Sequence, residues 1–183
     1  TEKIPFRIVT TASADVPLKG LDYLLEAFSK VVQIFPESTL EVIGSSKKGG
    51  HTTRKIKDLS IKDKVHFNKD LSFKEVRDLY CSSDIVVIPS LYEGFGFAIG
   101  EAMACRAPVI TTSGGAIPEV IGNCGITVAP GNSKELEEAM LKLLPDENLK
   151  NSLAEKGFNR IIEQLQWKEA AKLMTESYEA EIK

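Results

Sequence analysis

Residues 85 to 105 read IVVIPSLYEGFGFAIGEAMAC, an apolar run followed by a turn with two glycines and then a helical pattern. The run Ile85–Ile88 has the length and the continuous apolar character of a strand buried on both faces of a parallel sheet. Glycines in the turn let a backbone approach a ligand closely, because they carry no Cβ. The pattern therefore predicts a strand, a ligand-binding turn and a helix in direct succession.

Strand and helix patterns alternate along the rest of the chain. β-Branched or apolar runs predict strands, and apolar residues at helical spacing predict helices between them. Ser72, with Glu75 three residues later, has the pattern of a capping box at a helix start. The expected strands are 6–11, 40–43, 65–67, 85–88, 109–112 and 126–128, and the expected helices are 21–32, 53–59, one from 72, one to 104, 135–144 and two further segments from 147 onward.

This alternation predicts an α/β fold, a Rossmann-like parallel sheet of about six strands with helices on both faces. The 183 residues suit a single domain that ends in a helical extension over residues 147–183. In such sheets a ligand lies beyond the carboxyl ends of the strands. The expected binding loops are those after Thr11, Ile43, Phe67, Ile88 and Thr112.

Charge and hydropathy exclude several functional classes. The formal net charge is −3 and the pI is about 5.5, so no basic field exists to hold nucleic acid by charge alone. The basic residues between Lys47 and Lys57 are interpreted as a solvated loop and helix face. No apolar run approaches membrane-spanning length and no signal-peptide pattern occurs, so a cytoplasmic location is expected. Peripheral contact with a membrane through a partner domain stays compatible with this expectation.

The cysteines and histidines indicate no metal site and no disulfide framework. Cys81, Cys105 and Cys124 are odd in number and far apart along the chain. Cys81 and Cys105 fall in apolar helix patterns and are interpreted as small core residues in a reducing compartment. His51 and His66 are the only histidines, and no cluster has metal-ligand spacing. We therefore expect neither a metal nor a cofactor.

The turn after the buried strand, and the helix that follows it, carry the main candidate functional residues. The first amides of the following helix, at Gly96, Phe97 and Ala98, have no partner inside the helix and form an anion site suited to a pyrophosphate. Glu93 precedes the turn and can project into the crevice. Glu101 lies one helical turn further on, where a carboxylate can accept two hydroxyl hydrogen bonds from a ribose.

Two other loops contain candidate residues. Lys19, followed by Gly20, comes after the first strand and can point its ammonium group at a phosphate. Gly114 and Gly115 follow a later strand, and the sequence leaves open whether they line the ligand or only turn the chain. Both patterns are weak alone, because a loop lysine is usually solvated and paired glycines are common in turns.

Three similar motifs are weighed and set aside. Residues 94–100 resemble a dinucleotide fingerprint, but that motif normally opens the first strand–helix unit and here it follows several units. Residues 44–51 resemble the start of a phosphate loop but lack the Lys-Ser/Thr pair after the second glycine. An α/β-hydrolase would need a Gly-x-Ser-x-Gly elbow, which is not present.

Together these segments resemble the C-terminal, donor-binding domain of a family 4 glycosyltransferase of the GT-B fold. The resemblance spans essentially the whole chain. Its central motif is a Pro-Ser strand end, a glutamate, Gly-Phe-Gly and a second glutamate eight residues after the first. The residues that match are Pro89, Ser90, Glu93, Gly94, Phe95, Gly96, Glu101 and the following Ala-Met-Ala-Cys, Lys19–Leu21, Pro108–Ile110, Gly114–Val120 and Trp167.

The resemblance implies a role for each matching position. Glu93 would contact hydroxyls of the donor sugar, Glu101 would hold the ribose, and Lys19 would neutralise the diphosphate with help from amides near Phe97 and Ala98. The family transfers a hexosyl group from a UDP-, GDP- or ADP-sugar with retention of configuration and without a metal. The remaining expected donor contacts are Gly94, Phe95, Gly96, Ser13, Gly44, and the loop from Asn68 to Leu71, which would contact the base through backbone groups.

Three departures from the family pattern bear on the donor. An arginine that usually precedes the lysine is missing, and Ser13 is expected to donate a hydrogen bond in its place. Arg106 stands where the family often has glycine. Asn68 also replaces a common glycine, which asparagine tolerates because it accepts left-handed turns.

The family implies a second, N-terminal domain that binds the acceptor, which would be a sugar, a lipid or a small molecule. A chain that begins at Thr1, directly before the first strand, is interpreted as the C-terminal half alone. Two rival readings remain open. One is half of a nucleotide-sugar epimerase, and the other is a binding module without transfer activity. The scarcity of histidines argues against the epimerase, and the missing arginine gives some support to the binding module.

Overall fold

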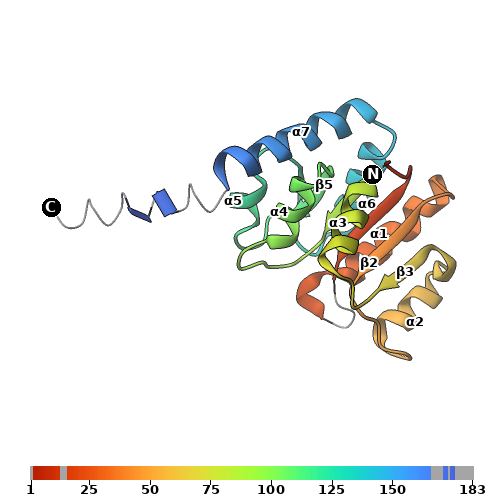
Figure 1. The fold of residues 1–183 in the computed structure, drawn as a ribbon. Helices are drawn as coiled ribbons and strands as arrows, with labels where there is room; N and C mark the ends of the chain where they lie inside the picture. Colours follow the sequence, from red (N-terminus) through yellow and green to blue (C-terminus); the bar gives the residue numbers. More distant parts are fainter. Residues whose placement is uncertain (1, 13–15, 166–170, 173, 176–183) are drawn as a thin grey trace.

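The computed structural model describes residues 2–12, 16–165, 171–172 and 174–175. It is an α/β fold whose six strands form one parallel sheet in the order β3-β2-β1-β4-β5-β6 (Figure 1). Every neighbouring pair of strands runs parallel. The strands are β1 (Arg7–Thr11), β2 (Thr39–Ile43), β3 (Val65–Asn68), β4 (Ile85–Ile88), β5 (Val109–Thr112) and β6 (Ile126–Val128).

At least one helix connects each strand to the next strand along the chain, as the crossovers of a parallel sheet require. Seven α-helices and two short 3-10 helices lie in the described part of the chain. The α-helices are α1 (Leu21–Ile34), α2 (His51–Asp58), α3 (Phe73–Ser82), α4 (Phe97–Ala104), α5 (Ile117–Ile121), α6 (Ser133–Leu143) and α7 (Glu147–Gln164), and the 3-10 helices are η1 (Pro17–Lys19) and η2 (Lys62–Lys64).

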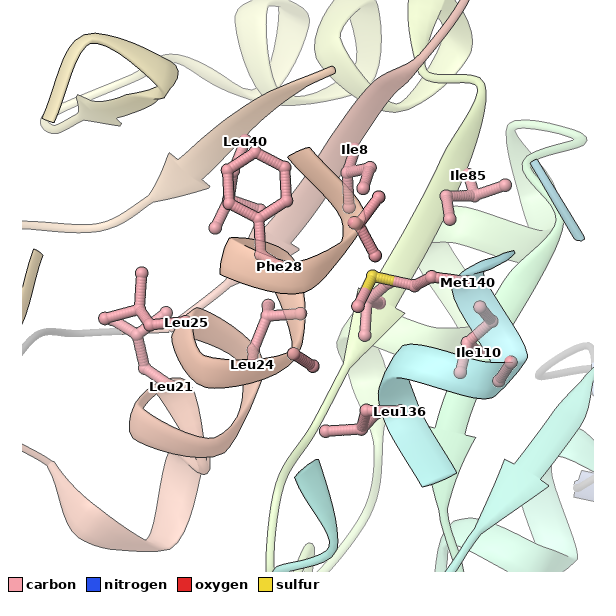
Figure 2. Close-up of a cluster of buried hydrophobic side chains, with 14 of the residues drawn as sticks. Ile8, Leu21, Leu24, Leu25, Phe28, Leu40, Ile85, Ile110, Leu136 and Met140 are labelled. Atoms are coloured by element: carbon pink, nitrogen blue, oxygen red, sulfur yellow. The ribbon is translucent and has the colours of Figure 1, made fainter. Parts of the chain in front are cut away.

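The two faces of the sheet carry two separate apolar clusters, because successive side chains of a strand point to opposite faces. Ile8 and its counterparts pack against α1, α2 and α6, whereas Val9 and its counterparts pack against α3, α4 and α5. Figure 2 shows Phe28 of α1 and Met140 of α6 meeting the side chains of the strands in the first cluster. The sheet is therefore covered on both sides, and its carboxyl edge is left to bind a ligand.

The strand order reverses between β1 and β4, which creates a topological switch point. Neighbouring loops diverge there, and α/β sheets bind ligands in the crevice that results. The two loops that leave this point are the one after Thr11 and the one after Ile88. They contain Lys19 and Glu93, the two residues predicted to be catalytic.

Helix α7 packs beside α4 and α6 (Figure 1). A buried ion pair fixes its first turn, because the Lys150 ammonium lies 2.6 Å from the Asp84 carboxylate directly before β4. The second Asp84 oxygen accepts a hydrogen bond of 2.8 Å from the Phe6 amide. Lys150 is only 4% exposed and Asp84 7%. This contact joins the start of α7 to the amino ends of β1 and β4.

The predicted elements agree with the structure to within about two residues at nearly every boundary, as helix ends usually allow. The capping box is present, since Ser72 and Glu75 exchange both hydrogen bonds. The short helix α5 and both 3-10 helices were not predicted. Ser13, Trp167 and most of the expected final helix lie outside the described residues.

Two sequence expectations are wrong. Asn68 ends β3 with extended backbone, and the left-handed residue of this loop is Asp70, with φ of 54°. Cys81 and Cys105 are only partly buried, although Cys105 packs against the edge of the second apolar cluster. Cys124 is the cysteine buried within that cluster, with 5% exposure.

Arg106 adopts a left-handed φ of 52°, which accounts for the glycine that the family often has here. Its guanidinium stacks 3.7 Å above the Phe158 ring and pairs with Glu155 at 3.0 Å. These contacts offset a backbone strain of about 1 kcal/mol. We expect Arg106→Gly to change the free energy of unfolding by less than about 1 kcal/mol, whereas Arg106→Ala keeps the strain, loses the contacts and costs about 1–2 kcal/mol. Urea unfolding of both variants measures the difference, and equal losses would contradict it.

Candidate active site

The loops after β1 and β4 are fastened together at the carboxyl edge of the sheet. The Leu91 amide donates to the Leu18 carbonyl at 2.8 Å. Gly20 adopts a left-handed φ of 67°, and a Cβ here would collide with the Pro89 carbonyl oxygen. Only glycine therefore allows the turn after Lys19 to close against the end of β4.

This closure brings Lys19 and Glu93 together. The Lys19 ammonium lies 2.8 Å from Glu93 Oε1, although the two residues are 74 positions apart. The buried Ser90 hydroxyl donates to the same oxygen at 2.7 Å. The Glu93 side chain is 16% exposed and that of Lys19 is 39% exposed. A fixed carboxylate and a more accessible cation thus share one edge of the crevice.

The paired glycines support the backbone around Glu93. Gly115 forms a parallel bridge with Glu93, and the Ala116 amide donates to the Glu93 carbonyl at 2.9 Å. A Cβ on Gly114 would collide with the Leu91 carbonyl oxygen, and one on Gly115 with that of Glu93. The sequence left open whether these two glycines line the ligand or only turn the chain. The structure gives them a third role, because they let the backbone pack closely against the Glu93 loop and hold it.

Helix α4 begins at the glycine turn as predicted. Gly96 is its N-cap, with a left-handed φ of 80°, and the first helical hydrogen bond runs from the Ile99 amide to the Gly96 carbonyl at 3.0 Å. The amides of Phe97 and Ala98 precede that bond, so they stand at the positive end of the helix dipole. A Cβ on Gly94 would meet no atom within 4 Å, so the turn is open on that side.

Two aromatic rings stand beside this helix start. The rings of Phe95 and Phe97 stack with their centroids 4.3 Å apart and remain 60% and 61% exposed. Exposed phenylalanines cost free energy in water, and stacked rings offer an apolar surface next to a polar site.

Glu101 lies one turn into α4 and is exposed, without a charged partner among the described residues. Partial burial of the Glu101 carboxyl nevertheless raises its pKa above the usual value of 4.5. Tyr80 lies nearby, with its ring buried and its hydroxyl 2.5 Å from Thr11 Oγ1 at the end of β1. Burial, together with the Glu101 charge and opposed by the Thr11 hydrogen bond, raises the pKa of Tyr80 to about 12.

The other expected donor contacts lie along the ends of β2 and β3. Gly44, Asn68 and Leu71 share the lining of one cleft of about 310 Å³. The Gly44 amide donates to the Asn68 carbonyl at 2.9 Å, and the Asn68 side chain donates to Glu41 at 2.8 Å. The Asn68 amide group is thus held by a side chain of β2.

A larger cleft of about 620 Å³ lies between the N-terminal segment and α3, and it is lined by neither Lys19 nor Glu93. It shares Asn68 and Leu71 with the smaller cleft. We place the candidate site at the switch point because the charged residues and the helix start converge there. Among the described residues, no group of three or more histidines, cysteines or acids could hold a metal ion.

Comparison with protein families matches residues 5–146 to the model described as glycosyl transferases group 1. The chain belongs to the group 1 glycosyltransferases. Among curated relatives, the MMP alpha-(1->4)-mannosyltransferase of Mycolicibacterium hassiacum is 35% identical over 179 residues, which cover 96% of this chain and 43% of the relative. The chain thus spans less than half the length of that glycosyltransferase.

Solved structures show the same fold. The Anabaena protein HepE in complex with UDP-glucose has a TM-score of 0.83 and 21% identity, covering 96% of this chain and 49% of that one. The C-terminal domain of the group 1 glycosyltransferase LpcC from Francisella tularensis has a TM-score of 0.78 and 25% identity, covering 90% and 89%. The resemblance to the C-terminal half of a GT-B fold is confirmed.

Three further polar residues of the candidate site, Ser90, Tyr80 and Thr11, were not predicted as site residues. Ser90 appeared only as part of a motif, and no role was predicted for Tyr80. Thr11 was taken as a strand end. Their polar atoms meet Glu93 or one another across the sheet, and such contacts leave no periodic signal in the sequence. No helix of the described chain is long and apolar enough to span a bilayer.

Proposed function

We propose that this chain is the donor-binding domain of a retaining hexosyltransferase that uses a UDP-, GDP- or ADP-sugar and needs no metal. The observation that carries the proposal is the contact between Lys19 and Glu93 beside the start of α4. It joins one cation, one carboxylate and two helix-start amides at the switch point of the sheet. HepE, of similar fold, was solved with UDP-glucose, which supports a nucleotide sugar as the ligand.

The arrangement suits departure of a nucleoside diphosphate. Breaking the bond between the anomeric carbon and the diphosphate oxygen leaves negative charge on the diphosphate. Lys19 and the amides of Phe97 and Ala98 would stabilise that charge, and fixed donors lower such a barrier. Glu93 would orient the sugar through its hydroxyls, and Glu101 would hold the ribose. The base would lie in the cleft at Gly44, Asn68 and Leu71.

The acceptor and its binding site belong to the N-terminal domain of the full-length protein. We propose that the 183 residues bind a nucleotide sugar weakly and transfer nothing alone. A binding module without transfer activity remains the second candidate, because the family's arginine is missing before Lys19. Transfer by the full-length protein separates the two.

The test is calorimetric titration of the chain with UDP-, GDP- and ADP-sugars and with NAD. We expect one sugar nucleotide to bind, and Lys19→Ala to weaken it about 10- to 100-fold, as loss of a charge-assisted hydrogen bond does. Lys134→Ala is the matched control, since Lys134 lies on α6 and pairs there with Glu137 and Glu138. Binding of NAD alone would refute the proposal.

As the pH falls, donor binding should begin to weaken at a higher pH than it would if Glu101 had the pKa of an ordinary glutamate. The Glu101 carboxylate accepts the ribose hydroxyls, so its protonation as the pH falls removes that contact. Because burial raises the pKa of Glu101, the loss begins above the usual 4.5. The dissociation constant of the sugar nucleotide, measured from neutral pH down to 4.5, should rise for the wild type. Glu101→Gln should bind more weakly throughout and lose this pH-dependent component, and an unchanged pH profile would contradict the assignment.

A further inference from the structure

Two of the three cysteines lie together behind the candidate site. Cys81 is in the last turn of α3, and Cys105 is the C-cap residue of α4. These two helices pack against each other, and both thiols are partly buried. Cys124 is separate, buried in the apolar cluster and bonded to Asn123.

Contacts of the Cys105 sulfur place it over the same turn of α3 as Cys81. Its Sγ lies 3.9 Å from the Arg77 carbonyl oxygen, four residues before Cys81. Cys81 follows Arg77 by one helical turn on the same face of α3, and its thiol lies close enough to Cys105 for a hydrogen bond between the two side chains. Burial raises the pKa of the Cys105 thiol, and the charge of Cys81 and a hydrogen bond to its sulfur raise it further. The two sulfur atoms are therefore direct neighbours.

We propose that Cys81 and Cys105 form an intramolecular disulfide when the protein meets a peroxide oxidant. Cys81 reacts first, because burial raises the pKa of the Cys105 thiol. The Cys81 thiolate attacks one peroxide oxygen, the O–O bond breaks, and a sulfenic acid forms. The Cys105 sulfur then displaces the hydroxyl group as water while its own proton leaves. Two electrons pass from the two sulfurs to hydrogen peroxide, which becomes two molecules of water.

The cationic side chains of Arg77 and Lys3 lie near both thiols. The disulfide would close a loop from 81 to 105 that contains β4, the glycine turn and all of α4. Oxidation would thereby fix the end of the helix that carries Glu101 to its neighbour α3.

The experiment treats the purified chain with hydrogen peroxide, digests it without reduction and identifies linked peptides by mass spectrometry. We expect a peptide pair joined through Cys81 and Cys105. The melting temperature should rise by about 5–10 °C, as closing a loop of this length predicts, and should fall back on reduction. Formation of the pair does not depend on donor binding.

Matched variants separate this disulfide from general oxidation. Cys81→Ser and Cys105→Ser should each abolish the linked peptide and the thermal shift, whereas Cys124→Ala should keep both. Circular dichroism of the reduced variants checks that each one folds. Separate sulfinic acids at Cys81 and Cys105 without a linked peptide would overturn the proposal, and so would a link that includes Cys124 or joins two chains.

Discussion

Glu93→Ala is expected to abolish the affinity advantage of a nucleotide sugar over the bare nucleoside diphosphate. Glu93 is proposed to contact the sugar, so its loss should weaken nucleotide-sugar binding about 10- to 100-fold, as expected for hydrogen bonds to a charged group. The bare diphosphate should bind as well as before or more tightly, because the Lys19 ammonium loses the carboxylate that lies 2.8 Å away. In the full-length protein, transfer should fall by about 100- to 1000-fold.

Calorimetry with the diphosphate and with its sugar ester measures both effects on the same variant. Glu138→Ala is the matched control, since this glutamate lies exposed on α6. Lys19→Ala should weaken both ligands, so the pair of variants distinguishes sugar contact from phosphate contact. If Glu93→Ala weakens both ligands equally, Glu93 maintains the loop and does not contact the sugar.

Lys150→Met is expected to lower the free energy of unfolding by about 3–5 kcal/mol, because it leaves the Asp84 carboxylate buried without its cation. Burial opposes the charge on Lys150, but hydrogen bonds from it to Asp84 and Glu147 outweigh that effect and raise its pKa. The contribution of the Lys150–Asp84 ion pair to the free energy of unfolding should therefore persist through neutral pH. It should fall only as the pH rises through the raised pKa, above 10.5.

Urea unfolding with a double-mutant cycle checks this prediction. Lys150→Met with Asp84→Asn should recover a large part of the loss, since no full charge then remains buried. Lys142→Met on α6 is the control for removing a lysine from the surface. A loss below about 1 kcal/mol for Lys150→Met would contradict the buried-pair account, because that is the range of exposed pairs.

The sheet could be predicted from the sequence because its signals are local. The continuous apolar run Ile85–Ile88 and the β-branched residues near Val9 define strands without reference to the rest of the chain. Helix α5 was not predicted, because its five residues between a glycine pair and Gly122 form a segment too short to show helical periodicity. The left-handed backbone of Asp70 and Arg106 was not predicted because neither residue is glycine. For Arg106 the cost is offset by contacts with Phe158 and Glu155 that only the fold creates.

The sequence named candidate site residues, but it did not predict which of them contact one another. The motif named Glu93, Lys19 and Glu101, and the fold supplied the direct contact between the first two. Thr11 and Tyr80 come from β1 and α3, so their hydrogen bond depends on how α3 crosses the sheet. The neighbouring sulfurs of Cys81 and Cys105 likewise depend on helix packing, which spacing along the chain does not encode.

Backbone amide NMR of the labelled chain during titration with the preferred nucleoside diphosphate tests the central claim most directly. Docking of the diphosphate at the start of α4 should move the Phe97 and Ala98 amide resonances most, together with those of Lys19 and Gly20. Amides of α6 and α7 should stay unchanged. Saturable shifts that spare residues 96–98 and gather in the cleft between the N-terminal segment and α3 would show that the phosphate binds elsewhere.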